Sequence, residues 1–416
     1  MRVTDKGYPQ ADRRIPKGDD FLSRAELESL TPQELVRRTT ELKPMIAAHA
    51  RECEILRRPV DKVWAAIRRT GVFYHFVPKV YGGLEFDVDT FIDAMLPIGE
   101  ACASTGWVTS FSVEHNWMLS QFPKAVQDET FGGAFPYVIA PGVTMPPGTA
   151  KPVEGGYRLS GHWKWGTCVM HADWVLVTGM VPGETPPRIL FFALPARDVS
   201  VPDTWHVDGM AGTGSNDIVA DDVFVPGHRV MDMGDMRTGT AYGARLYDNP
   251  IYRMPMLPFL AVTAAIPAVG AARGAVAAFR ERLSVRNLHG TETKQAEKPA
   301  AQMRLARADF LAKSAEMLVR HVARANVALG ARETPASIPE RIELRLMVAE
   351  AMGQCREAIS IICEASGAGS HFLDNPIQRA LRDVNVMANH VVYDLDGARE
   401  LHGRALIGLP PNSPVV

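Results

Sequence analysis

The apolar residues of this chain change their spacing twice. Helical spacing predominates at first, period-two alternation follows, and helical spacing then returns. A helix and a strand bury different positions, so one pattern cannot satisfy both. The order predicts an α+β protein with an N-terminal helical domain (1–132), a middle β domain (133–232) and a C-terminal helical bundle domain (233–416).

Helix signals are clear in the first domain. The run Thr31-Pro32-Gln33-Glu34 combines a capping residue, proline at the first helical position and an acidic first turn. Pro59 is expected to open a second helix that stops at Gly71. Residues 90–120 are expected to form one long helix, and small residues in its middle would admit a neighbouring helix or a ligand equally well.

Short alternating segments bounded by glycine and proline predict the strands of the middle domain. They lie at 175–177, 189–194 and 222–226 and favour a small barrel or sandwich.

A tryptophan-rich hairpin is predicted near the start of this domain, with turns at Gly155-Gly156 and Ser160-Gly161. On a strand, Trp163 and Trp165 would project to one face, with Thr167 next along it. Such a face could hold a planar ligand through ring contacts and a hydroxyl group. Burial of both indoles in the sheet core is the alternative, and spacing alone favours it.

Four long helical segments predict the C-terminal bundle. They cover roughly 259–286, 296–329, 339–366 and 376–402, with breaks at glycine-containing turns.

Composition limits the classes of function. Lys and Arg total 45 against 47 Asp and Glu in 416 residues, so no basic surface for nucleic acid or anionic membrane is expected. The five cysteines include no Cys-x-x-Cys pair and are expected to be reduced thiols of a cytoplasmic protein. The charged, proline-containing N-terminus does not resemble a signal peptide, and no apolar run of membrane-spanning length is expected.

Motifs for other cofactors are missing. There is no His-Glu-x-x-His or Glu-x-x-His spacing, so no metal site is predicted. No Gly-x-Gly-x-x-Gly follows a predicted strand, so the chain is not expected to take hydride from NAD(P)H directly.

Two segments carry a family resemblance. Residues 164–174 contain Lys-Trp-Gly-Thr followed by Ala-Asp-Trp, and residues 205–226 read WHVDGMAGTGSNDIVADDVFVP. The first is similar to the flavin-binding domain of the acyl-CoA dehydrogenase fold. The second resembles the reduced-flavin-dependent two-component (group D) monooxygenases built on that fold, which include p-hydroxyphenylacetate hydroxylase oxygenase components, the seco-steroid phenol hydroxylase and dibenzothiophene monooxygenase. The likeness extends in order over nearly the whole chain, although Ala211 stands where relatives commonly have arginine.

The resemblance implies an oxygenase component that hydroxylates an aromatic or polycyclic small molecule with O2 through a C4a-hydroperoxyflavin. It also implies reduced FMN or FAD, supplied by diffusion from a separate NAD(P)H:flavin reductase, and a homotetramer.

One substitution separates this chain from the dehydrogenases. Their carboxylate base falls at Val391 here, whereas His390 stands where the monooxygenases have histidine. An imidazole with an ordinary pKa of about 6.5 can relay a proton at cellular pH. The resemblance therefore implies a catalytic His390, and a helical ion pair between His390 and Asp394 is the alternative.

The resemblance also implies roles for other residues. Thr167 would bond flavin N5, and His115 would bind the hydroxyl of a phenol, unless His115 only caps a backbone group. The expected cofactor-binding residues are Trp163, Trp165, Thr167, Thr213, Ser215 and Arg286, and the expected substrate-binding residues are His115, Trp117 and Trp205.

Three other functions remain open on the sequence. An N- or S-oxygenating enzyme of the same fold would use the same site. An acyl-CoA dehydrogenase or oxidase is disfavoured by Val391, and a scaffold without flavin is disfavoured by the joint presence of Trp165, Thr167 and His390.

Overall fold

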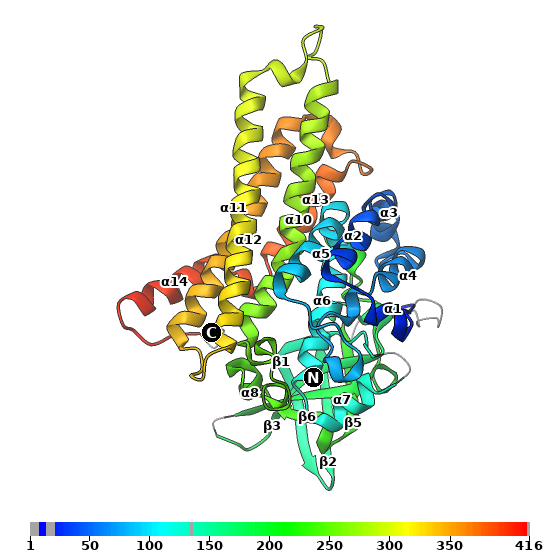
Figure 1. Cartoon of the computed structure of the whole chain (residues 1–416), viewed down its shortest axis with the longest axis vertical. Helices are drawn as coiled ribbons and strands as arrows, with labels where there is room; N and C mark the ends of the chain where they lie inside the picture. Colours follow the sequence, from blue (N-terminus) through cyan, green and yellow to red (C-terminus); the bar gives the residue numbers. More distant parts are fainter. Residues whose placement is uncertain (1–7, 14–20, 134–135, 186, 414–416) are drawn as a thin grey trace.

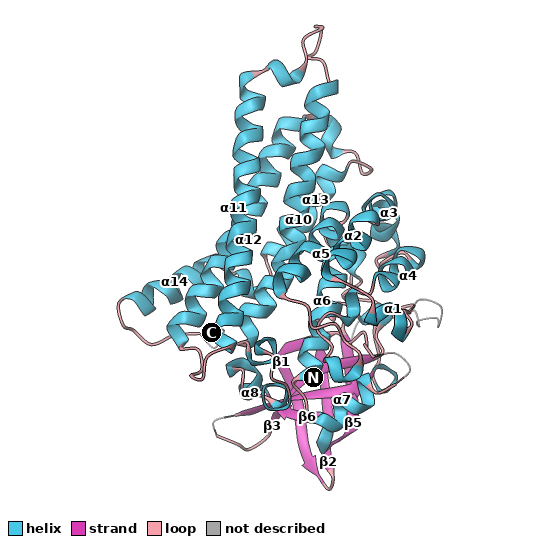
Figure 2. Ribbon diagram, in the orientation of Figure 1, coloured by secondary structure: helices cyan, strands magenta, loops and turns pink. Residues whose placement is uncertain are grey.

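The computed structural model describes residues 8–13, 21–133, 136–185 and 187–413 (Figure 1). Most of the N-terminal segment that we judged unlike a signal peptide lies outside these ranges. Figure 2 shows a sheet at one end of the molecule and long helices extending away from it. The expected α+β architecture is confirmed.

In the described part of the chain, seven α-helices precede the sheet, and they contain the expected caps. The Thr31 hydroxyl accepts a hydrogen bond from the Glu34 amide, and Gly71 ends a helix with φ +91°. The helices are α1 (Arg24–Glu28), α2 (Pro32–Glu41), α3 (Lys43–Leu56), α4 (Asp61–Thr70), α5 (Val88–Ala101), α6 (Ala103–Ser120) and α7 (Lys124–Phe131).

The single helix expected at 90–120 is wrong, because it is divided at Cys102. Cys102 is extended, with φ −157° and ψ 113°. A Cβ on Gly106 would lie 2.9 Å from the Gly99 Cα, and one on Gly99 would lie 3.0 Å from the Pro267 Cα. The small residues therefore serve the close approach of α5, α6 and α10.

Six strands of the described residues form one mixed sheet in the order β5-β2-β1-β3-β4-β6, with β1 and β3 parallel. The buried side chains of its inner face form a hydrophobic cluster separate from the helical core. The strands are β1 (Gly142–Val153), β2 (Gly156–Trp163), β3 (Trp174–Val181), β4 (Arg188–Pro195), β5 (Ile218–Pro226) and β6 (Val230–Asp232).

The expected hairpin is partly wrong. Its turn at Gly155, with φ +75°, joins β1 to β2. Ser160-Gly161 is not a turn, because β2 continues through it and only its register with β5 shifts between Leu159 and Gly161.

The helices that follow the sheet are α8 (Met233–Thr238), α9 (Tyr242–Leu246), α10 (Met256–Val285), α11 (Pro299–Gly330), α12 (Ile338–Ser366), α13 (Pro376–Ala388) and α14 (Leu395–Leu406). The last predicted helix, 376–402, is wrong as a single element. α13 ends before Asn389, and the Asp394 carboxylate accepts from the Gly397 amide to cap α14.

Helix α10 corrects another expectation. It is long and apolar enough to cross a bilayer, whereas we expected no such run. However, 78% of its most apolar window is buried, where α10 packs between α5, α6, α11 and α12. Within the described residues it is a core helix.

Candidate active site

Helix α6 lies between the sheet and the C-terminal helices (Figure 1). All of its residues except Phe111 are buried. Trp107, Phe111 and His115 are spaced by four and share one face of the helix. Trp107 stacks on Phe111 with ring centroids 4.6 Å apart, and His115 meets Phe111 edge-on at 5.5 Å. This face organises the candidate site.

A chain of hydroxyl groups joins this face to the β domain. The Trp107 indole N–H donates to Thr167 Oγ1 at 3.3 Å, and Thr167 Oγ1 lies 3.1 Å from Ser215 Oγ. Ser215 is 2.8 Å from the Thr213 hydroxyl, which donates to the Met210 carbonyl. The structure thus brings Thr167, Thr213 and Ser215 together.

The two indoles of the tryptophan-rich segment do not share a face, and the expected platform is wrong. Trp163 is fully buried in the sheet core, and its N–H donates to the Thr178 carbonyl at 2.9 Å. The chain leaves the strand after Trp163, and Trp165 adopts φ +66°, which is uncommon for a bulky residue. Trp165 is 65% exposed. Of the two indoles, Trp165 is the one exposed to a ligand.

His390 lies in the interruption between α13 and α14. Its Nδ1 accepts from the Val392 amide at 3.3 Å, and its ring is 6.0 Å from that of Trp107. The alternative of a helical ion pair with Asp394 is wrong, because His390 is outside a helix. The ring is accessible to solvent, yet surrounding protein atoms lower the pKa of His390 to about 4. The ring is therefore neutral at cellular pH while it stays accessible to solvent.

His115 is buried beside a carboxyl group. Its Nδ1 has no hydrogen-bond partner, while the Ala140 carbonyl bonds to the ring. Burial lowers the pKa of His115 to about 3. His115 Nε2 is 3.7 Å from Glu114 Oε1, and burial raises the pKa of Glu114 to about 8 although the Thr263 hydroxyl donates to it. Both groups are therefore uncharged at neutral pH, and they do not form an ion pair.

The other predicted residues lie apart from this face. Trp117 is buried in the core, where its N–H donates to the Ile251 carbonyl and its ring packs on Phe259, so its expected substrate contact is wrong. Trp205 is half-buried and donates to the Met210 carbonyl at 3.0 Å. Arg286 follows α10 at the end of the bundle remote from the sheet (Figure 1).

Two contributing residues were not predicted. Trp107 and His115 were expected to share a helical face, and the four-residue spacing could also have identified Phe111 between them. No sequence signal predicts that Asp383 Oδ1 accepts from the Met210 amide at 2.6 Å, a bond that ties α13 to the loop bearing the hydroxyl chain.

Three cavities of about 330 to 700 Å³ are found in the described residues. None of them is lined by Thr167, His115 or His390. Among the described residues, no group of three or more His, Cys, Asp and Glu side chains could hold a metal ion.

Comparison with known proteins gives the family. The family model described as acyl-CoA dehydrogenase, C-terminal domain, matches residues 262–395. The chain is 37% identical over 389 residues to a pigment production hydroxylase of Rhodococcus sp. (strain ATCC 21145), covering 93% of this chain and 100% of that protein. It is 33% identical to the oxygenase component of an FADH2-dependent resorcinol hydroxylase of Rhizobium sp. (strain MTP-10005), covering 91% of this chain and 95% of that protein.

The chain belongs to the oxygenase components of flavin-dependent two-component monooxygenases. A solved relative, XiaF from Streptomyces sp. in complex with FADH2 and glycerol, matches this oxygenase with a TM-score of 0.87 and 33% identity. The match covers 94% of this chain and 99% of that one. The fold and family expected from the two sequence segments are confirmed. The roles of individual site residues stay predictions.

Proposed function

We propose that this oxygenase hydroxylates an aromatic small molecule, with a phenol as the leading class, using O2 and reduced flavin from a separate reductase. One observation carries the proposal. Thr167 of the β domain, His115 of α6 and His390 of the C-terminal domain meet around Trp107 and Phe111.

The residues present fit a reduced flavin. Trp165 offers an exposed ring, while Thr167 and Ser215 offer hydroxyl groups. We assign flavin binding to Trp165, Thr167, Thr213 and Ser215, for either FMN or FAD. When bound, reduced flavin supplies the electrons that activate O2.

His390 is the candidate for proton transfer. Because Nδ1 accepts from the Val392 amide, the neutral ring carries its proton on Nε2, where it can donate a hydrogen bond to the oxygen that gains or loses a proton. Val391, where dehydrogenases have a carboxylate, has no group that can perform this step.

His115 is the candidate for orienting the substrate. Nδ1 has no hydrogen-bond partner in the free protein, so it can accept from a substrate hydroxyl group when the ring carries its proton on Nε2. The neighbouring Glu114 holds its own proton, so it does not draw one from His115. The relative acting on resorcinol supports the choice of a phenol.

The test mixes the oxygenase, chemically reduced FMN or FAD and a candidate substrate with oxygenated buffer, and quantifies oxygenated product and H2O2. Hydroxylated product from phenols, with no product from amines or thioethers, supports the proposal. Product from amines or thioethers alone, or flavin reduction by an acyl-CoA, contradicts it.

Turnover with chemically reduced flavin also tests diffusive transfer from the reductase, because a stable complex would make the reductase necessary. We further propose a cytoplasmic location, supported by five buried free cysteines.

A homotetramer is our proposal for the assembly. Met303, Phe310 and Met317 recur every seven residues along α11 and are each more than 60% exposed, as expected of a face that meets another subunit. Arg286 follows the last residue of α10, and we propose that it acts toward another subunit. Light scattering after size exclusion measures the mass, and a monomer would contradict this assignment.

A further inference from the structure

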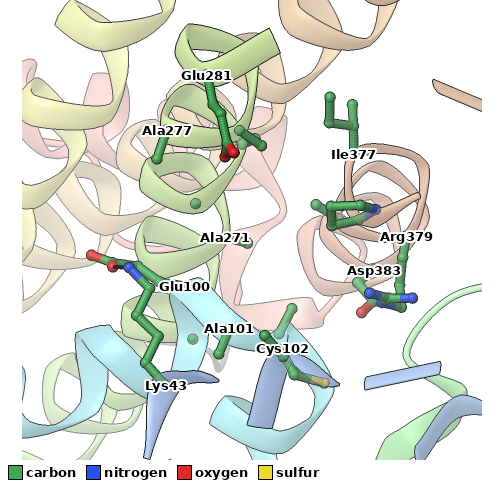
Figure 3. Close-up of a pocket in the computed structure, with 18 of the residues that line it drawn as sticks. Lys43, Glu100, Ala101, Cys102, Ala271, Ala277, Glu281, Ile377, Arg379 and Asp383 are labelled. Atoms are coloured by element: carbon green, nitrogen blue, oxygen red, sulfur yellow. Dashed lines mark hydrogen bonds and ion pairs between the residues drawn. The ribbon is translucent and has the colours of Figure 1, made fainter. Parts of the chain in front are cut away.

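A cavity of about 700 Å³ lies between α3, α5, α10 and α13 (Figure 3). Small side chains of α5 and α10 form much of its wall: Gly99, Ala101, Ala271, Gly274 and Ala275. Its volume suits a small-molecule ligand.

Arg379 lines this cavity and is only 8% exposed. Its Nη1 has no hydrogen-bond partner, and among the described residues Arg379 forms no ion pair. A buried guanidinium is costly unless an anion or acceptor meets it. Arg379 also lies in the first turn of α13, where the helix dipole favours negative charge.

Among the described residues no carboxylate forms an ion pair with Arg379, although the charge of Arg379 acts on Asp383 and lowers its pKa. Glu100 binds Lys43 and Arg273 instead. Asp383 projects beside Arg379 (Figure 3), but it accepts from the Met210 amide and the Ser104 hydroxyl, and burial raises its pKa to about 7.

Glu281 and Asp374 also line the cavity, but they are solvent-exposed, so water and salt screen their charge. Among the described residues Arg379 is therefore balanced only by the attraction of Asp383, whose pKa is raised to about 7, and its Nη1 has no acceptor.

We propose that this cavity is an anion-binding site in which Arg379 binds the phosphate or carboxylate group of a small molecule. The chemistry has two possible sources, the phosphate of a flavin or a separate small anion. Because Asp383 belongs to the same wall and holds Met210, the site adjoins the hydroxyl-bearing loop without including Thr167 or His390.

The proposal is independent of the oxygenation reaction, so binding is measured without turnover. Calorimetric titrations use the full chain with inorganic phosphate, and anaerobically with reduced FMN and reduced riboflavin. The Arg379→Gln variant should bind the anion at least about tenfold more weakly, as expected from loss of a charge-assisted hydrogen bond. Arg356→Gln removes an exposed arginine of α12 and is the matched control.

The titrations with phosphate, FMN and riboflavin distinguish a flavin phosphate from a separate small anion. Weaker binding of FMN but not of riboflavin to Arg379→Gln assigns the site to the flavin phosphate. Phosphate binding in the presence of saturating FMN, weakened by the same substitution, assigns it to a separate anion. Failure of the wild type to bind in either arm, or equal binding by Arg379→Gln, overturns the proposal.

Circular dichroism checks that Arg379→Gln is folded, and Arg379→Lys provides a second variant. Lysine keeps the charge but loses the planar fork, so an intermediate affinity is expected. Affinity equal to that of Arg379→Gln would contradict a role for the charge.

Discussion

The surroundings of His390 and His115 differ, although each imidazole contacts the same aromatic pair of α6. The His390 ring is accessible to solvent and its Nδ1 is satisfied by the Val392 amide. His115 is sealed, and its Nδ1 has no partner. The pKa is lowered to about 4 for His390 and to about 3 for His115, so neither carries charge at neutral pH. The two rings differ in solvent accessibility and not in charge. This difference favours proton exchange at His390 and a fixed hydrogen bond at His115.

The largest expected effect follows from removing the accessible ring. His390→Ala should lower product formation by about 100-fold, the usual contribution of a positioned acid or base, while reduced-flavin binding changes little. Product is measured by chromatography and flavin binding by anaerobic titration. His371→Ala, which removes an exposed histidine near the far end of the bundle, is the control. Full turnover by His390→Ala would remove the functional distinction between the two rings.

Replacing the sealed ring should have a smaller and different effect. His115→Ala should raise the KM for a phenol by about tenfold through loss of one hydrogen bond, with less change in kcat. His115→Gln, which can still accept a hydrogen bond, should recover part of the loss. A large fall in kcat at saturating phenol would instead place proton transfer at His115.

Thr167 connects the two environments through the Trp107 N–H. Thr167→Val retains the shape but loses the hydroxyl, so product yield should fall by roughly threefold while H2O2 release rises. Thr167→Ser keeps the hydroxyl and should behave like the wild type. The ratio of product to H2O2 per flavin oxidised is the measurement, and an unchanged ratio in Thr167→Val would count against its role.

A prediction about stability concerns Glu114, the neighbour of His115. Folding raises the pKa of Glu114 from 4.5 to about 8, so the folded chain keeps a proton that the unfolded chain loses. This stabilisation is complete below about pH 4.5 and is lost as the pH rises to about 8. Relative to Glu114→Gln, the wild type should therefore lose roughly 1 kcal/mol of unfolding free energy per pH unit in this window. Urea denaturation at several pH values measures the difference, and parallel profiles would show that Glu114 is not a buried acid.

The sequence predicted the larger features of the molecule because they depend on repeated patterns. The change from helical to alternating spacing located the sheet, and capping residues such as Thr31 located helix starts. The two family segments contain Thr167 and Ser215, and comparison with the position of the dehydrogenase base, which falls at Val391, pointed to His390.

The features that were missed depend on contacts between distant segments. The break at Cys102 follows from the packing of α5 against α10, and periodicity within 90–120 contains no sign of it. Trp165 leaves the strand at positive φ, so alternation placed it on the wrong face. The missing acceptor at Arg379 Nη1 could be recognised only in the structure, where Glu100 and Asp383 bind other groups.

The bond between Asp383 and the Met210 amide has a mechanical consequence. It fastens the helix preceding His390 to the loop that continues into Thr213 and Ser215. If the C-terminal helices rotated relative to the sheet, the hydrogen bond between Asp383 and the Met210 amide would have to break before His390 and Thr167 could separate. The segment that bears His390 and the loop that bears Thr213 and Ser215 should therefore move together in thermal motion. Breaking this hydrogen bond should change the mobility of both segments at the same time.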